Sequence, residues 1–226
     1  MEANGYQIEP QANLEGVALV NANLRGANLK LANLKGANLA EADLIDANLE
    51  GANLEGANLE GAKLSGACLI DANLKEANLF NTMIAYANLR EANIYGADLR
   101  FAYLHESNFR STNLVLANFR CAYIRNSKFT FSDFSHSSFV EADLIESDLF
   151  YANLTGAFLW NADLTDANLA YANLTGADFS NANLSNVNLE GADLTNANLT
   201  NVNLTNVVTG LADFTGAILP DGTIHD

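Results

Sequence analysis

The sequence predicts an all-β solenoid in which the chain coils through short parallel bridges around a narrow apolar interior. The first observation is a five-residue repeat that runs through 12–219 without an insertion or deletion. The second is that the 42 positions from Leu14 to Leu219 in steps of five hold 31 Leu, 7 Phe, 3 Ile and one Thr. The third is that every residue two places earlier is Ala, Ser, Val or Thr. Self-similarity at a fixed period indicates a repeat architecture rather than a globular domain.

The period of five indicates the backbone conformation of each repeat. It fits neither an α-helix, with 3.6 residues per turn, nor a flat strand, with a period of two. A small and a large residue two places apart point to the same side of an extended segment, and the next three residues must turn the chain. The last position of the repeat suits a type II turn, which needs a positive φ at its third residue, because it holds 12 of the 15 Gly and nine Asn. Each coil is then expected to hydrogen-bond only to its two neighbours.

The motif itself is a small residue, then Asn or Asp, then Leu or Phe, as in Ala27-Asn28-Leu29 and Ala57-Asn58-Leu59. It resembles the motif of the pentapeptide-repeat family, and the resemblance covers 12–219. The resemblance implies a right-handed quadrilateral parallel β-helix with four repeats per coil. Residues 20 apart would then stack in one column at about 4.8 Å, and the repeats would form about ten and a half four-sided coils.

Three segments follow in chain order. Residues 1–11 are interpreted as an N-terminal lead or cap, since the open end of a solenoid exposes unpaired edges. The β-helix is predicted over 12–219; within it, 107–139 has Phe at the central position and Ser or Thr at the small one, a local variation of the core. Quinolone-resistance members of the family are similarly rich in Phe. Residues 220–226 are predicted to form a closing turn and tail, because Pro220 removes a donor and Asp-Gly favours a turn.

Charge is distributed unevenly along the chain, whose net charge is −16. All 11 Lys and Arg lie between Arg25 and Lys128, whereas 129–226 contains 13 acids and no base. That half would be a rod of roughly 24 Å, and duplex DNA of the same length carries about 14 charges. Two interpretations remain: a duplex mimic that enters a basic groove, or acidity that only keeps a solenoid soluble. Direct binding of nucleic acid by this half is disfavoured by repulsion.

Several outward columns are candidate surfaces. Stacked like charges are unfavourable unless something else is gained, and exposed aromatic strips serve either as structural ladders or as binding surfaces. The predicted interaction surface therefore contains acidic and aromatic members: Asp143, Glu146, Asp163, Asp166, Asp193, Asp213, Phe131, Tyr151, Tyr171 and Trp160. A basic patch is predicted at Arg90, Arg100, Arg110, Arg120 and Arg125. It serves either to neutralise nearby acids such as Glu91, Asp98 and Glu106 or to contact an anion or a partner.

Catalysis, cofactors and metals are not predicted. The three His residues are outward or terminal and are not clustered, and no Ser/His/Asp set or metal-ligand spacing is present. A filled interior also leaves no concave site of the usual kind. No stretch has the length of a membrane span. Cys68 and Cys121 fall in different columns and are expected to be free thiols, which favours the cytoplasm.

The expected function is that of a non-enzymatic scaffold that presents rigid, partly acidic faces to a protein partner. The alternative comes from the resemblance to quinolone-resistance members, which implies a DNA mimic that binds DNA gyrase or topoisomerase IV. Those members also dimerise through their C-terminal ends, and Val207, Val208, Leu211 and Ile218 are the residues that would form such a homodimer here.

Overall fold

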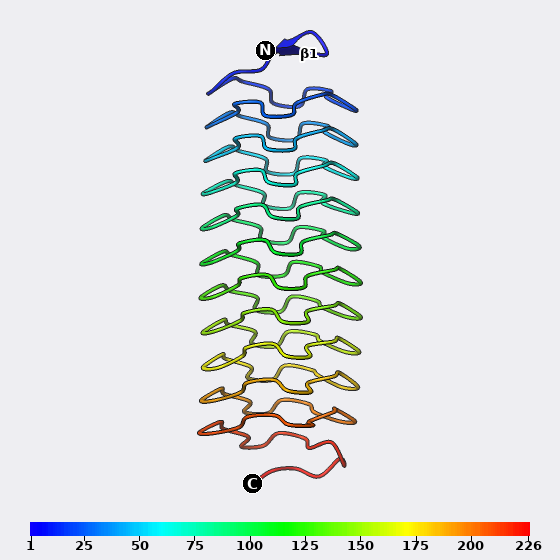
Figure 1. Ribbon diagram of the computed structural model, residues 1–226, viewed down its shortest axis with the longest axis vertical. Coiled ribbons are helices and arrows are strands. Elements are labelled where there is room, and N and C mark those ends of the chain that lie inside the picture. The colour runs from blue at the N-terminus through cyan, green and yellow to red at the C-terminus, as the bar shows by residue number, and fades with distance from the viewer.

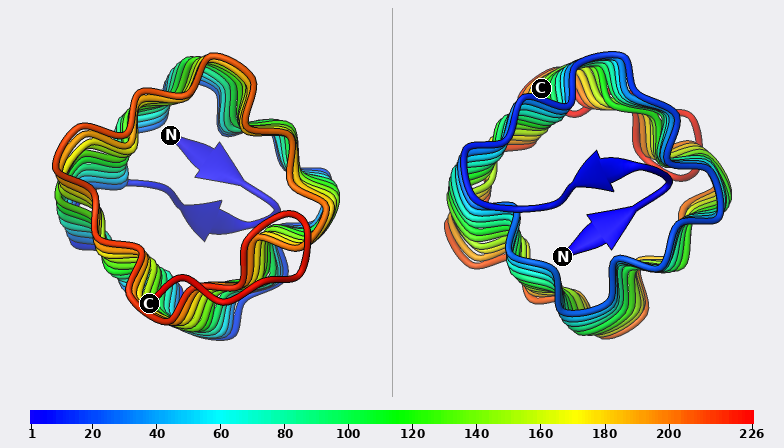
Figure 2. Two further views of the ribbon diagram at one scale, coloured as in Figure 1. Left: turned by 90° about the horizontal axis from the view of Figure 1, so that it is seen from below. Right: turned by 90° about the horizontal axis from the view of Figure 1, so that it is seen from above.

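The computed structural model describes all residues from Met1 to Asp226 and forms a straight rod (Figure 1). Parallel bridges connect the coils, and each joins a residue to the one 20 places later, from Asn13–Asn33 to Asn198–Ile218. Seen along its axis, the rod has four sides (Figure 2). The fold is the right-handed quadrilateral β-helix that the family resemblance implies. Its sheets are ladders of single-residue bridges, because each wall holds one bridged residue before the chain turns.

Backbone hydrogen bonds run between coils on both sides of each bridged residue. The N–H of Leu14 donates to the carbonyl of Asn33 at 2.7 Å, and the N–H of Asn33 donates to the carbonyl of Ala12 at 2.9 Å. Within each turn, the N–H of the next small residue returns to the preceding central carbonyl, as from Ala27 to Leu24 at 2.9 Å. The peptide groups between coils are thus paired, which allows a rod this thin to exclude water from its backbone.

Every turn has a positive φ at its third residue, from Gln11 to Gly216 in steps of five, with values between 55° and 71°. Gly and Asn fill only half of these positions; the others include Tyr86, Phe101 and Tyr151. A left-handed conformation costs an L-residue about 1–2 kcal/mol. None of these residues is β-branched, which is consistent with the steric origin of that cost. The repeat therefore adopts the positive φ of this turn even at residues for which that conformation is unfavourable.

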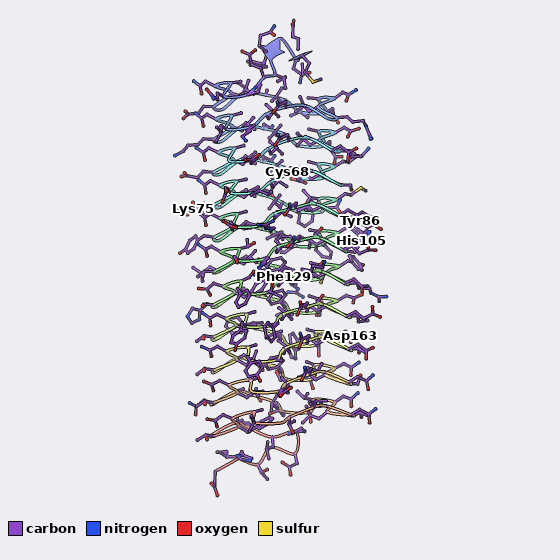
Figure 3. All side chains as sticks on the ribbon, turned by 60° about the vertical axis from the view of Figure 1, so that its left-hand side comes forward. Cys68, Lys75, Tyr86, His105, Phe129 and Asp163 are labelled. Carbon is purple, nitrogen blue, oxygen red and sulfur yellow. The ribbon has the colours of Figure 1, made fainter.

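The interior is filled by the two inward residues of each repeat. Central Leu, Ile and Phe side chains and neighbouring Ala form one continuous buried cluster along the axis. In the Phe-rich stretch, Phe119 stacks on Phe139 with ring centroids 4.8 Å apart. Phe134 meets Phe129 and Phe139 edge-on, at 5.1 Å in each case. The shift to Phe leaves the register of 20 between coils unchanged, while other side chains project outward along the whole rod (Figure 3).

Buried Ser hydroxyls accompany this Phe-rich core, and their hydrogen bonds explain how they are accommodated. Ser127 Oγ donates to the carbonyl of Leu104 at 2.7 Å, and Ser132 Oγ donates to that of Phe109 at 2.6 Å. In both pairs the acceptor lies 23 residues earlier, in the preceding coil. Ser137 is the exception, because its buried Oγ has no hydrogen-bond partner.

Replacing Ser137 by Ala should stabilise the protein by about 1–3 kcal/mol, because the substitution removes a buried hydroxyl that has no partner. Urea unfolding would measure the change. Ser127→Ala is the matched control: it removes a satisfied hydroxyl and leaves the carbonyl of Leu104 without that donor, so it should destabilise. Equal effects of the two substitutions would contradict this account.

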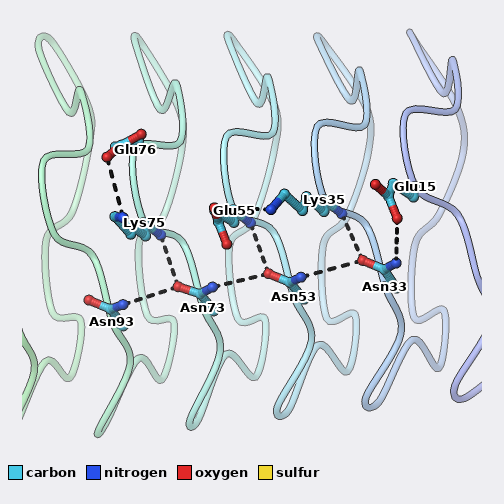
Figure 4. Close-up of polar contacts among 9 residues, drawn as sticks. All are labelled: Glu15, Asn33, Lys35, Asn53, Glu55, Asn73, Lys75, Glu76 and Asn93. Atoms are coloured by element: carbon cyan, nitrogen blue, oxygen red, sulfur yellow. Dashed lines mark hydrogen bonds and ion pairs between the residues drawn. The ribbon is translucent and has the colours of Figure 1, made fainter.

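Outward Asn residues form a second, polar ladder. On one wall, from Asn33 to Asn113, the Nδ2 group of each Asn donates to Oδ1 of the Asn one coil earlier, for example from Asn73 to Asn53 and from Asn93 to Asn73, both at 3.1 Å (Figure 4). The same Oδ1 accepts from the backbone N–H two residues on, as from Lys75 to Asn73 at 3.2 Å. Asn is thus favoured here because one side chain supports its own turn and the next coil.

The two ends of the rod differ. Strands β1 (Glu2–Ala3) and β2 (Tyr6–Gln7) form an antiparallel hairpin that lies across the N-terminal end (Figure 2). Ile8, directly after the hairpin, is buried in the core. At the other end, an antiparallel bridge joins Ile218 to Ile224. Leu211 is 87% exposed there. The C-terminal end therefore leaves apolar side chains in contact with water.

Candidate interaction surfaces

The outer walls carry all the features that could serve as a site. The central side chains are inaccessible over almost the whole rod. No group of three or more His, Cys, Asp and Glu side chains is arranged to hold a metal ion. No helix has the length and apolar character needed to cross a membrane. Cys68 and Cys121 are free, and burial, with the neighbouring Glu141, raises the pKa of the Cys121 thiol, so it favours the protonated form.

The structure brings the first four predicted acids onto one wall. Asp143 and Asp163 are bridge partners, and Glu146 and Asp166 occupy the turns that follow them. We call these four residues the acidic wall patch. Arg125 limits its charge, because its Nε lies 2.6 Å from Asp143 Oδ2. The patch therefore keeps a net negative charge of three when Arg125 is included.

Asp143 and Asp163 also have a structural task that sequence reasoning did not assign to them. Asp163 Oδ1 accepts from the backbone N–H of Thr165 at 3.0 Å, and Asp143 Oδ1 accepts from that of Ile145 at 3.3 Å. These are the bonds that Asn makes elsewhere in the rod. Asp is therefore tolerated here as a turn former, and this offsets part of the cost of stacking like charges.

The second acidic pair, Asp193 and Asp213, stacks on another wall. The Thr195 hydroxyl and then the Thr195 N–H, at 2.9 Å, lower the pKa of Asp193. The backbone N–H of Thr215, also at 2.9 Å, lowers the pKa of Asp213. Both groups therefore remain ionised at neutral pH, despite their proximity.

Replacing Thr195 by Val should raise the pKa of Asp193 towards the ordinary Asp value of about 3.9, because the main donor to the carboxylate is lost. The folded pKa lies below the unfolded one, so the associated stability is present above about pH 4 and is lost as the pH falls through the folded pKa. NMR titration of the carboxyl carbon would measure the shift. Thr155→Val, next to Asn153, is the control and should leave Asp193 unchanged.

The predicted aromatic column is present as a stack. Phe131 lies on Tyr151 with ring centroids 5.6 Å apart, and Tyr151 lies on Tyr171 at 5.2 Å. Phe150 meets Tyr151 edge-on at 4.6 Å. Arg110 covers the N-terminal end of the stack, with its guanidinium carbon 5.3 Å from the Phe131 ring centroid. The ring faces are thus used within the column, and mainly ring edges face solvent.

Trp160 lies on a different wall from this column, with 42% of its surface exposed. Sequence reasoning named Trp160 as a member of the predicted interaction surface. It overlooked Phe158, which is 51% exposed and lies two residues before Trp160 on the same outer wall. Phe158 stands at a position where most repeats have Asn or Asp, and this departure was the available signal.

Most of the predicted basic patch is neutralised, and its members lie in three separate columns. Four of the five Arg have a carboxylate partner: Arg90–Glu91 at 3.6 Å, Arg100–Asp98 at 2.7 Å, Arg120–Glu141 at 3.6 Å and Arg125–Asp143 at 2.6 Å. Arg110 has none. Glu106, expected to be a neutralising acid, instead accepts from the Tyr86 hydroxyl at 3.3 Å. The structure therefore does not gather these five residues into one basic surface.

A cluster that sequence reasoning missed lies on the same wall as the acidic wall patch. The bridge column that continues into Asp143 consists there of Met83, Tyr103 and Tyr123 in successive coils. Tyr86 and His105 stand beside it, with ring centroids 5.1 Å apart. We call these five residues the aromatic wall patch. Figure 3 shows Tyr86, His105 and Asp163 on the same side of the rod.

Comparison with known proteins defines the class. The family model of pentapeptide repeats matches in eight copies, over residues 11–44, 42–79, 84–120, 117–150, 147–186 and 172–221. The chain belongs to the pentapeptide-repeat family. A search of curated proteins gave no match.

Among solved structures, the chain is similar to HetL from the cyanobacterium Nostoc sp. strain PCC 7120, a pentapeptide repeat protein involved in regulation of heterocyst differentiation. The identity is 31% over 96% of this chain and 92% of HetL, with a TM-score of 0.41. A pentapeptide repeat protein from the Arabidopsis thaliana thylakoid lumen is 34% identical over 45% of this chain and 67% of that one, with a TM-score of 0.34. QnrB1, a plasmid-mediated fluoroquinolone resistance protein, is 20% identical over 79% of this chain and 92% of its own, with a TM-score of 0.46.

Proposed function

We propose that this pentapeptide-repeat protein is a non-enzymatic scaffold whose rigid walls bind a protein partner. The observation that supports this proposal is the filled interior, which leaves only outward side chains for any contact. Exposed aromatic residues on several walls, among them Tyr103, Tyr151 and Trp160, add to it, because aromatic residues are enriched in protein interfaces. The free thiols of Cys68 and Cys121 favour action in a reducing compartment, the cytoplasm.

Site-specific photocross-linking in the producing cells tests the scaffold. A photoreactive phenylalanine analogue would be placed at Tyr103, Phe131 or Phe158, one wall or corner at a time. A scaffold should yield a cross-linked partner from one of these positions and not from the others. The absence of any cross-linked protein at all three would overturn the proposal.

A second candidate function is mimicry of duplex DNA, directed at DNA gyrase or topoisomerase IV. Charge supports it: 129–226 carries 13 acids without a base, close to the roughly 14 charges of a duplex of about 24 Å. The acidic wall patch supplies four of these acids on one wall. Arg125 reduces the resemblance to DNA charge at the N-terminal edge of the patch, because it pairs with Asp143.

A gyrase supercoiling assay, with and without a quinolone and at two salt concentrations, tests the mimic. Inhibition or protection should weaken as salt rises, because the contact would be electrostatic. It should be abolished by Asp143→Asn, Glu146→Gln, Asp163→Asn and Asp166→Asn together. The control combines Glu41→Gln with Asp46→Asn, in the half of the chain that contains all the Lys and Arg residues, and should retain the effect. No effect of the unmodified protein at micromolar concentration would exclude this function.

We also propose that two copies associate through their C-terminal ends. Val208 and Leu211 are 52% and 87% exposed there, whereas the hairpin covers the opposite end. A monomeric mass by light scattering would overturn this proposal. If the dimer is found, Leu211→Asp should return it to a monomer.

A further inference from the structure

The aromatic wall patch lacks side-chain hydrogen bonds that most of the rod has. At most other positions of its column type, Asn or Asp accepts from the backbone N–H two residues on, as Asp163 does from Thr165 at 3.0 Å. Met83 has no oxygen to accept in this way, and the hydroxyls of Tyr103 and Tyr123 accept no such bond from the backbone N–H two residues on. Asp43 and Lys63 precede Met83 in this column and Asp143 follows Tyr123, so the Asn-to-Asn bond is absent from this stretch as well. Three successive coils therefore lack the bond that a side-chain oxygen makes to its own turn.

Structural compensation accounts for only part of this loss. Tyr103 and Tyr123 stack with ring centroids 4.8 Å apart and an interplanar angle of 9°. That contact is a favourable aromatic pair. Met83 is 46% exposed, and its thioether makes no hydrogen bond. The patch thus places a flexible thioether and two aromatic rings in water, at positions where Asn would serve the fold better.

The side chains form a shallow hollow rather than a flat strip. A concavity of about 180 Å³ is lined by Ser65, Met83, Ala85, Tyr103 and His105. Tyr86 stands at its edge, 58% exposed, and contacts His105 edge-on. The lining of the hollow is mostly apolar, and the size of the hollow suits one aliphatic or aromatic side chain rather than a whole small molecule.

The charges beside the hollow indicate what kind of chain would enter it. Continuing along the same column, the next two bridged residues are Asp143 and Asp163, with Glu146 and Asp166 in their turns. Arg125 is the only base among them, and no Lys or Arg follows Lys128 in the sequence. A partner that lies along this wall would thus meet an apolar hollow first and a net negative surface next.

We propose that this wall binds an extended segment of a partner protein that carries one apolar anchor residue and, a few residues away, Lys or Arg. The anchor fills the hollow between Met83, Tyr103 and His105, and the basic residues contact the acidic wall patch. Tyr103 and Asp143 lie two coils apart, or about 10 Å, which an extended chain spans with about three residues. Asp163 lies one coil further, so the basic residues are expected three to five positions from the anchor. The inference rests on the proposed scaffold function and specifies its surface and its partner class.

Fluorescence anisotropy with the full-length protein tests the proposal. The probes are labelled ten-residue Gly/Ser peptides with Leu, Met, Phe or Trp as anchor and Arg at the third and fifth positions after it. A matched set has Glu in place of Arg. At least one Arg peptide should bind, more weakly as salt rises, and the Glu set should not. Failure of every Arg peptide to bind at about 1 mM, a free energy of about −4.1 kcal/mol, would overturn the proposal.

Three variants separate the contributions. Met83→Asn, Tyr103→Asn and Tyr123→Asn together place the commonest residue of this repeat position in three successive coils. This variant should fold at least as stably as the wild type and bind at least about tenfold more weakly, or about 1.4 kcal/mol. Asp143→Asn, Glu146→Gln, Asp163→Asn and Asp166→Asn together should weaken binding by a similar factor. Phe158→Asn with Trp160→Thr, on another wall, should leave it unchanged. Binding that survives in the triple-Asn variant would reduce the contact to charge alone and overturn the hollow as an anchor site. Such a result, or no binding, leaves the cross-linking test of the scaffold unaffected.

Discussion

Replacing Phe119 by Ala is expected to lower the free energy of unfolding by about 3–5 kcal/mol. The ring is completely buried, stacked on Phe139 at 4.8 Å and in edge contact with Phe134 at 5.9 Å. The coils above and below are fixed to each other by backbone hydrogen bonds on both sides, so the walls cannot collapse into the space that the ring leaves. Urea unfolding of the purified protein would measure the loss.

Phe131→Ala is the matched control for that measurement. Phe131 is 50% exposed at a turn and stacks on Tyr151 on the outside of the rod. Its loss should cost no more than about 1.5 kcal/mol, the upper value for an aromatic pair. If the two substitutions had equal effects, the assignment of Phe119 to the interior and Phe131 to the surface would be wrong.

Replacing Gly191 by Val is expected to destabilise the protein by about 2–3 kcal/mol, through backbone strain and the loss of an aromatic contact. Gly191 has a φ of +64°, which a β-branched residue adopts only with strain. A Cβ atom there would lie 2.6 Å from the Tyr171 ring, which rests against the glycine and ends the aromatic column. The ring must therefore move, and its stacking on Tyr151 is weakened.

Gly176→Val separates the two contributions to that effect. Gly176 has the same φ of +64°, but a Cβ atom there would meet nothing within 4 Å. It should cost only the strain, about 1–2 kcal/mol. Urea unfolding of both variants gives the difference, which is the part due to Tyr171. A greater loss for Gly176 than for Gly191 would contradict this explanation of the column's end.

Substitutions of outward residues are expected to be tolerated better than substitutions of inward residues. The inward residues hold the rod together, so a substitution there affects every surface at once. Outward residues such as Met83 and Tyr123 can be replaced by Asn, which most repeats already carry at that position. A loss of binding in such a variant can therefore be assigned to the surface itself, without the ambiguity that unfolding would introduce.

The sequence by itself determined the architecture, the inward and outward faces and the columns. Because the period of five has no insertion, every coil of four repeats contains 20 residues. Residues 20 apart must therefore stack. The stack of Phe131, Tyr151 and Tyr171 and the pairing of Asp143 with Asp163 follow from that register. The aromatic wall patch was equally readable, since Met83, Tyr103 and Tyr123 depart from the usual Asn or Asp of their repeat position at intervals of 20, but it was overlooked.

The tertiary structure decided what each side chain does within its column. Arg125 reaches forward to Asp143, whereas Arg100 turns back to Asp98, and the period contains nothing that separates these rotamers. The Ser127 hydroxyl finds an acceptor in the preceding coil and that of Ser137 finds none. The hairpin across the N-terminal end lies outside the repeat altogether. A period specifies backbone register, but the direction of a flexible side chain depends on neighbours several ångströms away in adjacent coils, so only the folded chain determines it.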